Sequence, residues 1–207
     1  MALGSQNLCN DPFQVGVGVQ TVAYGISDVL HLFFALTPVS SHMFGGKTHA
    51  SAMELADKLS AMVPMSDGRV FLGNSGSDAN DTLLKLIRYH AEASGQPQRI
   101  KVIAREQGYH GVTLASAALT AIPTNHAHFQ LPFEALGVLR TGSANYYRGA
   151  VEGETEAEFV ARRANELESL ILAEGPDTIA AMIAEPVSGA GGVIVPPAGY
   201  FEAIQAV

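Results

Sequence analysis

Apolar side chains recur with the period of an α-helix in several stretches of the chain. Residues 51–62, 77–94 and 155–175 predict three helices in this way. Local signals set their ends: Ser51 with Glu54 and Thr155 with Glu158 have the spacing of a capping box, and Pro64, Gly95 and Gly175 are typical helix stops. We also expect a helix from about Val112, and a last one in residues 199–207 that has no C-cap.

Short apolar runs lie between these helices and predict strands. They are residues 69–73, 100–105 and 179–185, and the last of them has no polar face. Strands that are apolar throughout are typical of a sheet that is covered on both sides. The sequence therefore predicts an α/β fold with a mainly parallel sheet flanked by helices.

Three polar loops follow the three predicted strands: residues 75–78 (SGSD), 108–111 (GYHG) and 185–192 (EPVSGAGG). Ligands of such sheets bind at the carboxyl ends of the strands. The first loop also begins a helix, where unpaired amides and the hydroxyls of Ser75 and Ser77 suit a phosphate group. The alternative is that one of these serines only caps the helix.

Composition and charge exclude several classes of function. The chain has 207 residues, a formal net charge of −8 and no basic block, so nucleic acid is not an expected partner. No apolar run is long enough for a membrane helix, and the first residues do not resemble a signal peptide. A single cysteine, Cys9, favours a reducing cytoplasm. His126 and His128 are typical of a surface loop, and we expect no metal site.

Several long segments resemble one enzyme family. These are FLGNSGSDANDTLLKLIRYH, GYHGVTLASAALT, MIAEPVSGAGGVIVPPAGYF and, upstream, FGGKTHASAMELADKL. They are similar to segments of the class III aminotransferases, pyridoxal-phosphate enzymes of fold type I that include the ω-transaminases. The resemblance runs from Ser41 to the last residue. It implies that residues 41–207 are an incomplete cofactor-binding large domain, preceded by a divergent segment, residues 1–40.

The resemblance implies that pyridoxal 5'-phosphate is the cofactor. The predicted cofactor-binding residues are Ser75, Gly76, Ser77, Tyr109, His110, Gly111 and Glu185. Gly76 and Ser77 match the phosphate cup, and Tyr109 matches the aromatic residue that stacks on the pyridine ring. Glu185 matches a carboxylate beside the cofactor. Asp78 stands where the family usually has glutamate, a side chain with a longer reach.

No catalytic residue is assigned to this chain. Transamination needs a lysine that holds the cofactor aldehyde as a Schiff base and moves a proton. The family places this lysine after the third loop, whereas the lysines here are Lys47, Lys58, Lys85 and Lys101, all before Tyr109. The aspartate that pairs with the pyridine nitrogen is expected downstream as well. We therefore expect a truncated family member that is inactive by itself.

The resemblance implies a transaminase that moves an amino group from an amine or amino acid to a keto acid such as pyruvate. It also implies a homodimer in the full-length protein. Two alternatives stay open at this point. The same fold serves other pyridoxal-phosphate reactions, such as decarboxylation or racemisation. The second alternative is an inactive fragment that binds only a phosphate ligand or a partner chain.

Overall fold

The computed structural model describes residues 48–63 and 69–207. The chain divides into two compact units: described residues 48–63 and 69–73 belong to one, and residues 74–207 belong to the other. The predicted N-terminal segment, residues 1–40, and the predicted helix stop Pro64 lie outside the described residues.

The first unit contains the helix α2, Ala50–Met62, as the apolar period predicts. Its N-cap is His49, whose Nδ1 accepts a hydrogen bond from the amide of Ala52 at 3.2 Å. The predicted capping box of Ser51 and Glu54 is therefore wrong. Because the helix begins at Ala50, Ser51 already lies inside the first turn, where it cannot act as the N-cap, and Glu54 pairs with Lys58 at 2.9 Å.

Residues 69–73 do not form the predicted strand. They have no regular secondary structure, and the side chains of Phe71 and Leu72 are 62% and 52% exposed. An apolar run becomes a strand only when another strand pairs with its backbone, and none of the described strands pairs with this segment. The first polar loop therefore does not follow a strand.

The second unit contains a parallel sheet of three strands in the order β2-β1-β3. The strands are β1 (Lys101–Arg105), β2 (Val138–Thr141) and β3 (Ile179–Ile183). The central strand β1 aligns Val102 with Val138 on one side and with Ala181 on the other. Strands β1 and β3 confirm two of the predicted runs and the parallel sheet. The sequence missed β2 because its four residues, VLRT, are too few to show an alternation.

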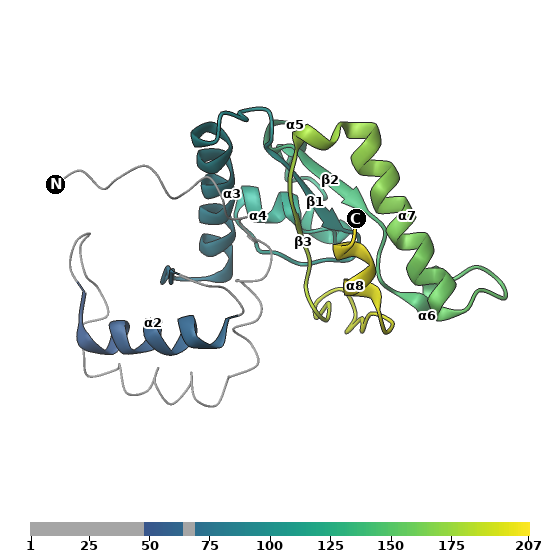
Figure 1. The fold of residues 1–207 in the computed structure, drawn as a ribbon, viewed down its shortest axis with the longest axis horizontal. Coiled ribbons are helices and arrows are strands. Elements are labelled where there is room, and N and C mark those ends of the chain that lie inside the picture. Colours follow the sequence, from purple (N-terminus) through teal and green to yellow (C-terminus); the bar gives the residue numbers. More distant parts are fainter. Residues whose placement is uncertain (1–47, 64–68) are drawn as a thin grey trace. The chain divides into compact units, whose positions relative to one another are not determined.

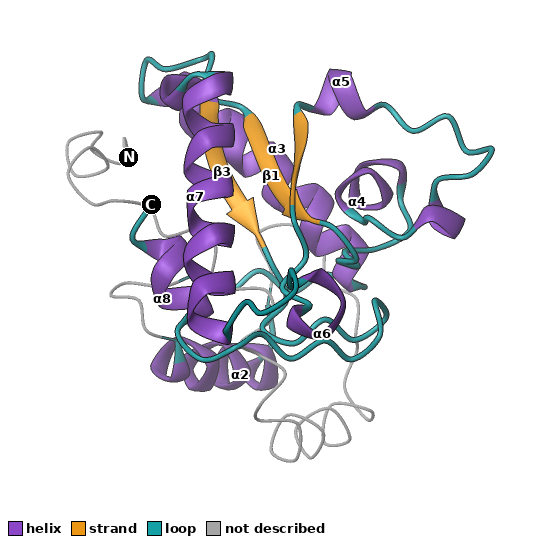
Figure 2. Cartoon of the chain, turned by 90° about the vertical axis from the view of Figure 1, so that its right-hand side faces the viewer, coloured by secondary structure: helices purple, strands orange, loops and turns teal. Residues whose placement is uncertain are grey.

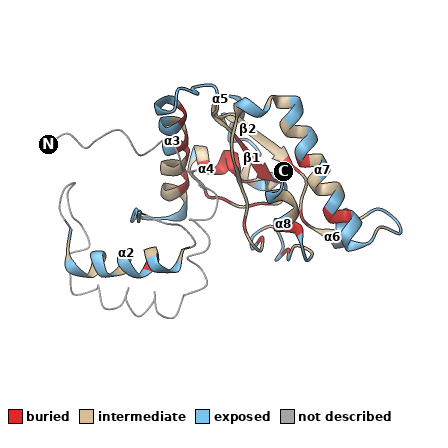
Figure 3. Ribbon diagram, in the orientation of Figure 1, coloured by how far each residue is buried: buried red, intermediate tan, exposed pale blue. Residues whose placement is uncertain are grey.

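Helices cover both faces of this sheet (Figures 1 and 2). Helix α3, Gly76–Ala93, lies on one face and α7, Glu156–Glu174, lies on the other. Buried residues gather on β1 and recur along α3 and α7 (Figure 3). Each helix buries one stripe, because the period of 3.6 residues brings apolar positions to the same side.

The helix ends agree with most of the local signals. Thr155 and Glu158 form the predicted capping box of α7. The helix predicted from Val112 is α4, Leu114–Leu119, which begins two residues later because Thr113 is its N-cap. The last helix, α8 (Tyr200–Gln205), has a C-cap that the sequence did not predict: the amide of Ala206 bonds to the carbonyl of Glu202. The shorter elements are η2 (Pro123–Asn125), α5 (Phe133–Leu136), α6 (Tyr146–Gly149) and η3 (Pro176–Thr178).

Candidate functional site

The first polar loop is the N-terminus of α3. Ser75 is the N-cap, and its Oγ accepts a hydrogen bond from the amide of Asp78 at 3.1 Å. The carboxylate of Asp78 turns back and accepts from the amide of Asn74 at 3.0 Å. The amides of Gly76 and Ser77 find no acceptor in the described part of the chain. Ser75 thus caps the helix, and two amides remain at the positive end of its dipole.

The second polar loop lies directly against this helix start. Ser77 Oγ accepts a hydrogen bond from the amide of Val112 at 3.0 Å. Asn80 Nδ2, one turn further along α3, donates to the carbonyl of His110 at 2.6 Å. Gly111 touches the helix so closely that a Cβ atom there would lie 2.5 Å from Ser77 Oγ. The structure therefore brings the first two loops together, although 35 residues separate Ser77 from Val112.

The third polar loop is tied to the second by the carboxylate of Glu185. Its Oε2 accepts a hydrogen bond from the amide of Tyr109 at 3.0 Å, and its Oε1 accepts from the amide of Gly189 at 3.2 Å. The Glu185 side chain is buried. Gly191 packs against the backbone of Gln107 with no room for a side chain. Both carboxylate oxygens of Glu185 thus hold backbone amides, one in each loop.

His110 is a buried residue of the second loop. Its amide donates to Thr120 Oγ1 at 2.8 Å, while its ring Nε2 is buried and has no hydrogen-bond partner in the described residues. Burial lowers the pKa of the His110 imidazole from its ordinary 6.5 to about 4, and the positive charges of Arg140 and Arg105 contribute to the same shift. The ring is therefore neutral at pH 7.

Acid is expected to destabilise the protein through His110. Between pH 6.5 and about 4 the unfolded chain binds a proton at this imidazole that the folded chain excludes. The free energy of unfolding should therefore fall with pH in this window, by about 3 kcal/mol at pH 4. Urea unfolding at several pH values measures this loss. A His110→Leu variant should lack this part of the slope, and an unchanged slope in the variant would assign the acid sensitivity to other groups.

Two arginines support the loops, and the sequence did not single out either of them. Arg105 ends β1 and is 1% exposed; it donates to the carbonyl of Glu185 and lies 3.4 Å from Ser188 Oγ. Arg140 in β2 donates to three carbonyls at the C-terminal end of α4, those of Ala118, Leu119 and Thr120.

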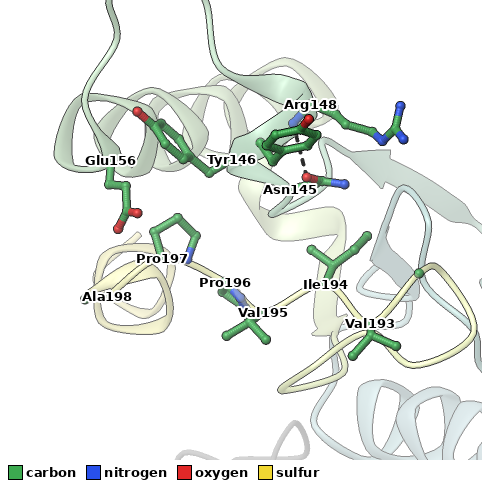
Figure 4. Close-up of a pocket in the computed structure, with 12 residues that line it drawn as sticks. Asn145, Tyr146, Arg148, Glu156, Val193, Ile194, Val195, Pro196, Pro197 and Ala198 are labelled. Atoms are coloured by element: carbon green, nitrogen blue, oxygen red, sulfur yellow. Dashed lines mark hydrogen bonds between the residues drawn. The ribbon is translucent and has the colours of Figure 1, made fainter.

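A cavity of about 520 Å³ lies beside α6 (Figure 4). It is lined by residues 145–148 around α6, by Glu156 of α7 and by residues 192–198. None of the predicted cofactor-binding residues lines it. The cavity therefore does not contribute to the candidate site.

The start of α3 has the donors and the space that a phosphate group requires. Ser75 Oγ and Ser77 Oγ each accept from a backbone amide, so their hydroxyl protons are free to donate to a phosphate oxygen. A Cβ atom at Gly76 would meet nothing within 4 Å, so a ligand can approach the backbone there. The charge of Asp78 opposes an anion, but its Oδ2 is bound to Asn74. These residues fit the phosphate of the implied cofactor.

The family follows from a comparison with known proteins. The model of the family described as Aminotransferase class-III matches residues 26–207. The chain belongs to the class III aminotransferases. The resemblance noted in the sequence is thereby confirmed, and the parallel sheet between helices agrees with it.

Similar proteins are transaminases. Gamma-aminobutyrate transaminase 1, mitochondrial, of Oryza sativa subsp. indica is 51% identical over 167 residues, which cover 80% of this chain and 32% of the relative. The Solanum lycopersicum protein of the corresponding name is 52% identical with the same coverage. The ω-transaminase of Pseudomonas jessenii, solved in complex with PMP, has a TM-score of 0.78 and 47% identity over 86% of this chain and 39% of its own. The chain thus spans about a third of the length of the curated relatives that it matches.

Within this class III aminotransferase, the lysines of the described residues have ordinary surroundings. Lys58 pairs with Glu54 and Lys101 pairs with Glu174, each at 2.8 to 2.9 Å. Lys85 is exposed on α3. Lys47 lies outside the described residues.

Among the described helices, none is both long and apolar enough to span a membrane.

Proposed function

We propose that this chain is the cofactor-binding portion of a pyridoxal-phosphate-dependent transaminase. One observation carries the proposal. The phosphate-binding helix start, the loop of Tyr109 and the loop of Glu185 are joined by direct hydrogen bonds from Val112 to Ser77 and from Tyr109 to Glu185. Three loops that are distant in the sequence thus form one candidate site.

Each residue of the site has a distinct role in this proposal. The amides of Gly76 and Ser77, with the hydroxyls of Ser75 and Ser77, bind the phosphate, because they place donors at the positive end of a helix dipole. The half-buried ring of Tyr109 covers one face of the cofactor ring. When bound, pyridoxal phosphate supplies the electron-withdrawing ring that makes a proton of the substrate easier to remove.

Glu185 and Gly111 determine where Tyr109 lies. The Glu185 carboxylate fixes the amide of Tyr109, and Gly111 lets the following backbone lie against Ser77. His110 remains neutral, so it adds no positive charge beside the phosphate. Its role in this proposal is to fill the space beneath the loop.

The substrates and partners in this proposal follow the family. The donor is an amine or amino acid and the acceptor is a keto acid such as pyruvate. The full-length protein is a homodimer in the cytoplasm, although the two plant relatives named above are mitochondrial proteins. The competing hypotheses are another pyridoxal-phosphate reaction and an inactive fragment that binds only a phosphate ligand or a partner chain. Measured transamination by the full-length protein would contradict the first, and binding of pyridoxal phosphate in preference to inorganic phosphate by the 207-residue chain would contradict the second.

A Gly76→Ala substitution tests the phosphate cup. The added methyl group meets nothing within 4 Å, so the substitution should leave the fold intact and raise the thermal unfolding midpoint slightly, because alanine favours a helix over glycine. The methyl group occupies the space where the phosphate approaches, and losing about one charge-assisted hydrogen bond should weaken binding of pyridoxal phosphate about tenfold. Equilibrium dialysis of the 207-residue chain against pyridoxal phosphate measures this change.

The control is the reverse change, Ala93→Gly, in the last residue of the same helix. We expect it to leave the affinity for pyridoxal phosphate unchanged while lowering helix stability slightly. An equal affinity of the Gly76→Ala variant and the unchanged chain would contradict binding at the start of α3.

A further inference from the structure

Asp81 lies one turn after Ser77 on α3, and three donors meet at a single oxygen of its carboxylate. Oδ1 is 2.7 Å from Thr113 Oγ1, 2.8 Å from Ser116 Oγ and 3.2 Å from the amide of Ser116. Thr113 is the N-cap of α4, and Ser116 lies in its first turn. Asp81 therefore binds the beginning of α4 from a neighbouring helix.

The same group of side chains reaches the phosphate cup. Ser116 Oγ, which is completely buried, also lies 2.9 Å from the carbonyl oxygen of Ser77. Gly111 and Val112, directly before Thr113, contact Ser77 and leave no space: a Cβ atom at Gly111 would lie 2.7 Å from Ser116 Cβ. The position of α4 relative to α3 thus determines where the loop of Tyr109 meets the helix start.

The N-cap of α4 is weak without Asp81. Thr113 Oγ1 lies 3.4 Å from the amide of Ser116, which is long for a hydrogen bond, and the helix has fewer than two turns. The carboxylate of Asp81 supplies the shorter contact to the same amide. A short helix with a weak cap depends on its tertiary contacts for its position.

We propose that Asp81 is a positioning residue that aligns the loop of Tyr109 with the phosphate-binding start of α3. This inference rests on the proposed function, since it assigns Asp81 a part in holding the cofactor site together. Asp81 does not bind the phosphate itself, because its charge is negative. It acts through Thr113 and Ser116.

The direction in which the affinity for pyridoxal phosphate changes distinguishes this positioning role from a simple charge effect. A negative charge one turn from the cup repels a phosphate, so removing the charge alone should strengthen binding. Losing the contacts that hold α4 in position should weaken binding of the phosphate. The Asp81→Asn variant keeps an oxygen at Oδ1, and Oδ2 has no partner within the described residues. The Asp81→Ala variant keeps neither the oxygen nor the charge.

The experiment compares both variants with the unchanged 207-residue chain by equilibrium dialysis against pyridoxal phosphate. We expect Asp81→Ala to weaken binding about tenfold and Asp81→Asn to change it by less than about threefold. Glu92→Gln, on the exposed end of the same helix, is the charge-matched control and should have no effect. Equal effects of the two Asp81 variants, or tighter binding by both, would overturn the proposal.

Amide hydrogen exchange gives a second measurement that needs no ligand. In Asp81→Ala the amide of Ser116 should exchange at least tenfold faster, while the amide of Ile87 in α3 keeps its rate and reports an intact fold. An unchanged rate at Ser116 would overturn the proposal. If the unchanged chain binds no pyridoxal phosphate, the proposed function fails, and the exchange rates alone then decide whether Asp81 positions α4.

Discussion

Gly111→Ala is expected to lower the free energy of unfolding by about 4 kcal/mol. The new Cβ atom would lie 2.5 Å from Ser77 Oγ and 2.7 Å from Ser116 Cβ, distances at which the neighbouring groups must move. Gly111 also has a φ of +135°, which side-chain-bearing residues rarely adopt. Overpacking and backbone strain each cost about 1 to 3 kcal/mol. Because α3 meets the second loop here, the substitution also separates the two loops.

Urea unfolding of the variant and the unchanged chain measures this loss. Gly189→Ala is the matched control, since a Cβ atom there meets nothing within 4 Å and its φ is ordinary; we expect a change within about 0.5 kcal/mol. A Ser77→Ala change added to Gly111→Ala removes one of the two clashes and should restore part of the stability. A Gly111→Ala chain as stable as the Gly189→Ala chain would mean that the two loops are not in contact.

Glu185→Ala is expected to cost a similar amount, about 4 kcal/mol, and to weaken binding of pyridoxal phosphate. The substitution leaves the amides of Tyr109 and Gly189 without an acceptor. Hydrogen bonds to a charged group are worth about 1.5 to 3 kcal/mol each. With the carboxylate gone, the backbone of Tyr109 loses its hydrogen bond to the third loop. The ring of Tyr109 then loses the orientation that the proposed stacking requires.

Glu185→Gln is the informative comparison for this prediction. It keeps one oxygen but turns an N–H group toward one of the two amides, so we expect about half the loss of stability. Amide hydrogen exchange at Tyr109 and Gly189 follows each contact separately. If both amides keep their exchange rates in Glu185→Ala, the carboxylate does not hold the loops together.

The local sequence predicted most features of the start of α3. The sequence placed a helix start and unpaired amides around Gly76, and it left open whether a serine only capped the helix. The structure has both features: Ser75 is the cap, and the amides of Gly76 and Ser77 have no acceptor in the described residues. The predicted strand before it, residues 69–73, was wrong, because an apolar run alone does not supply a pairing partner.

The roles assigned to individual residues by resemblance remain predictions. The structure places Ser77, Gly111, Tyr109 and Glu185 in one connected group, which is the arrangement that those roles require. His110 Nε2 is buried without a partner in the described residues. The supporting side chains, Asp81, Arg105 and Arg140, had no signal that distinguished them from other charged residues in helices and strands.

The sequence by itself determined the helices α2, α3 and α7, the strands β1 and β3, and the family. These depend on periodicity, on caps and on motifs whose residues lie a few positions apart. Only the tertiary structure decided that Ser77 meets Val112, that Glu185 holds Tyr109 and that Asp81 binds the start of α4. The reason is physical: these contacts join residues 32 to 76 positions apart, and which distant donor meets which acceptor is fixed by the packing of helices on the sheet.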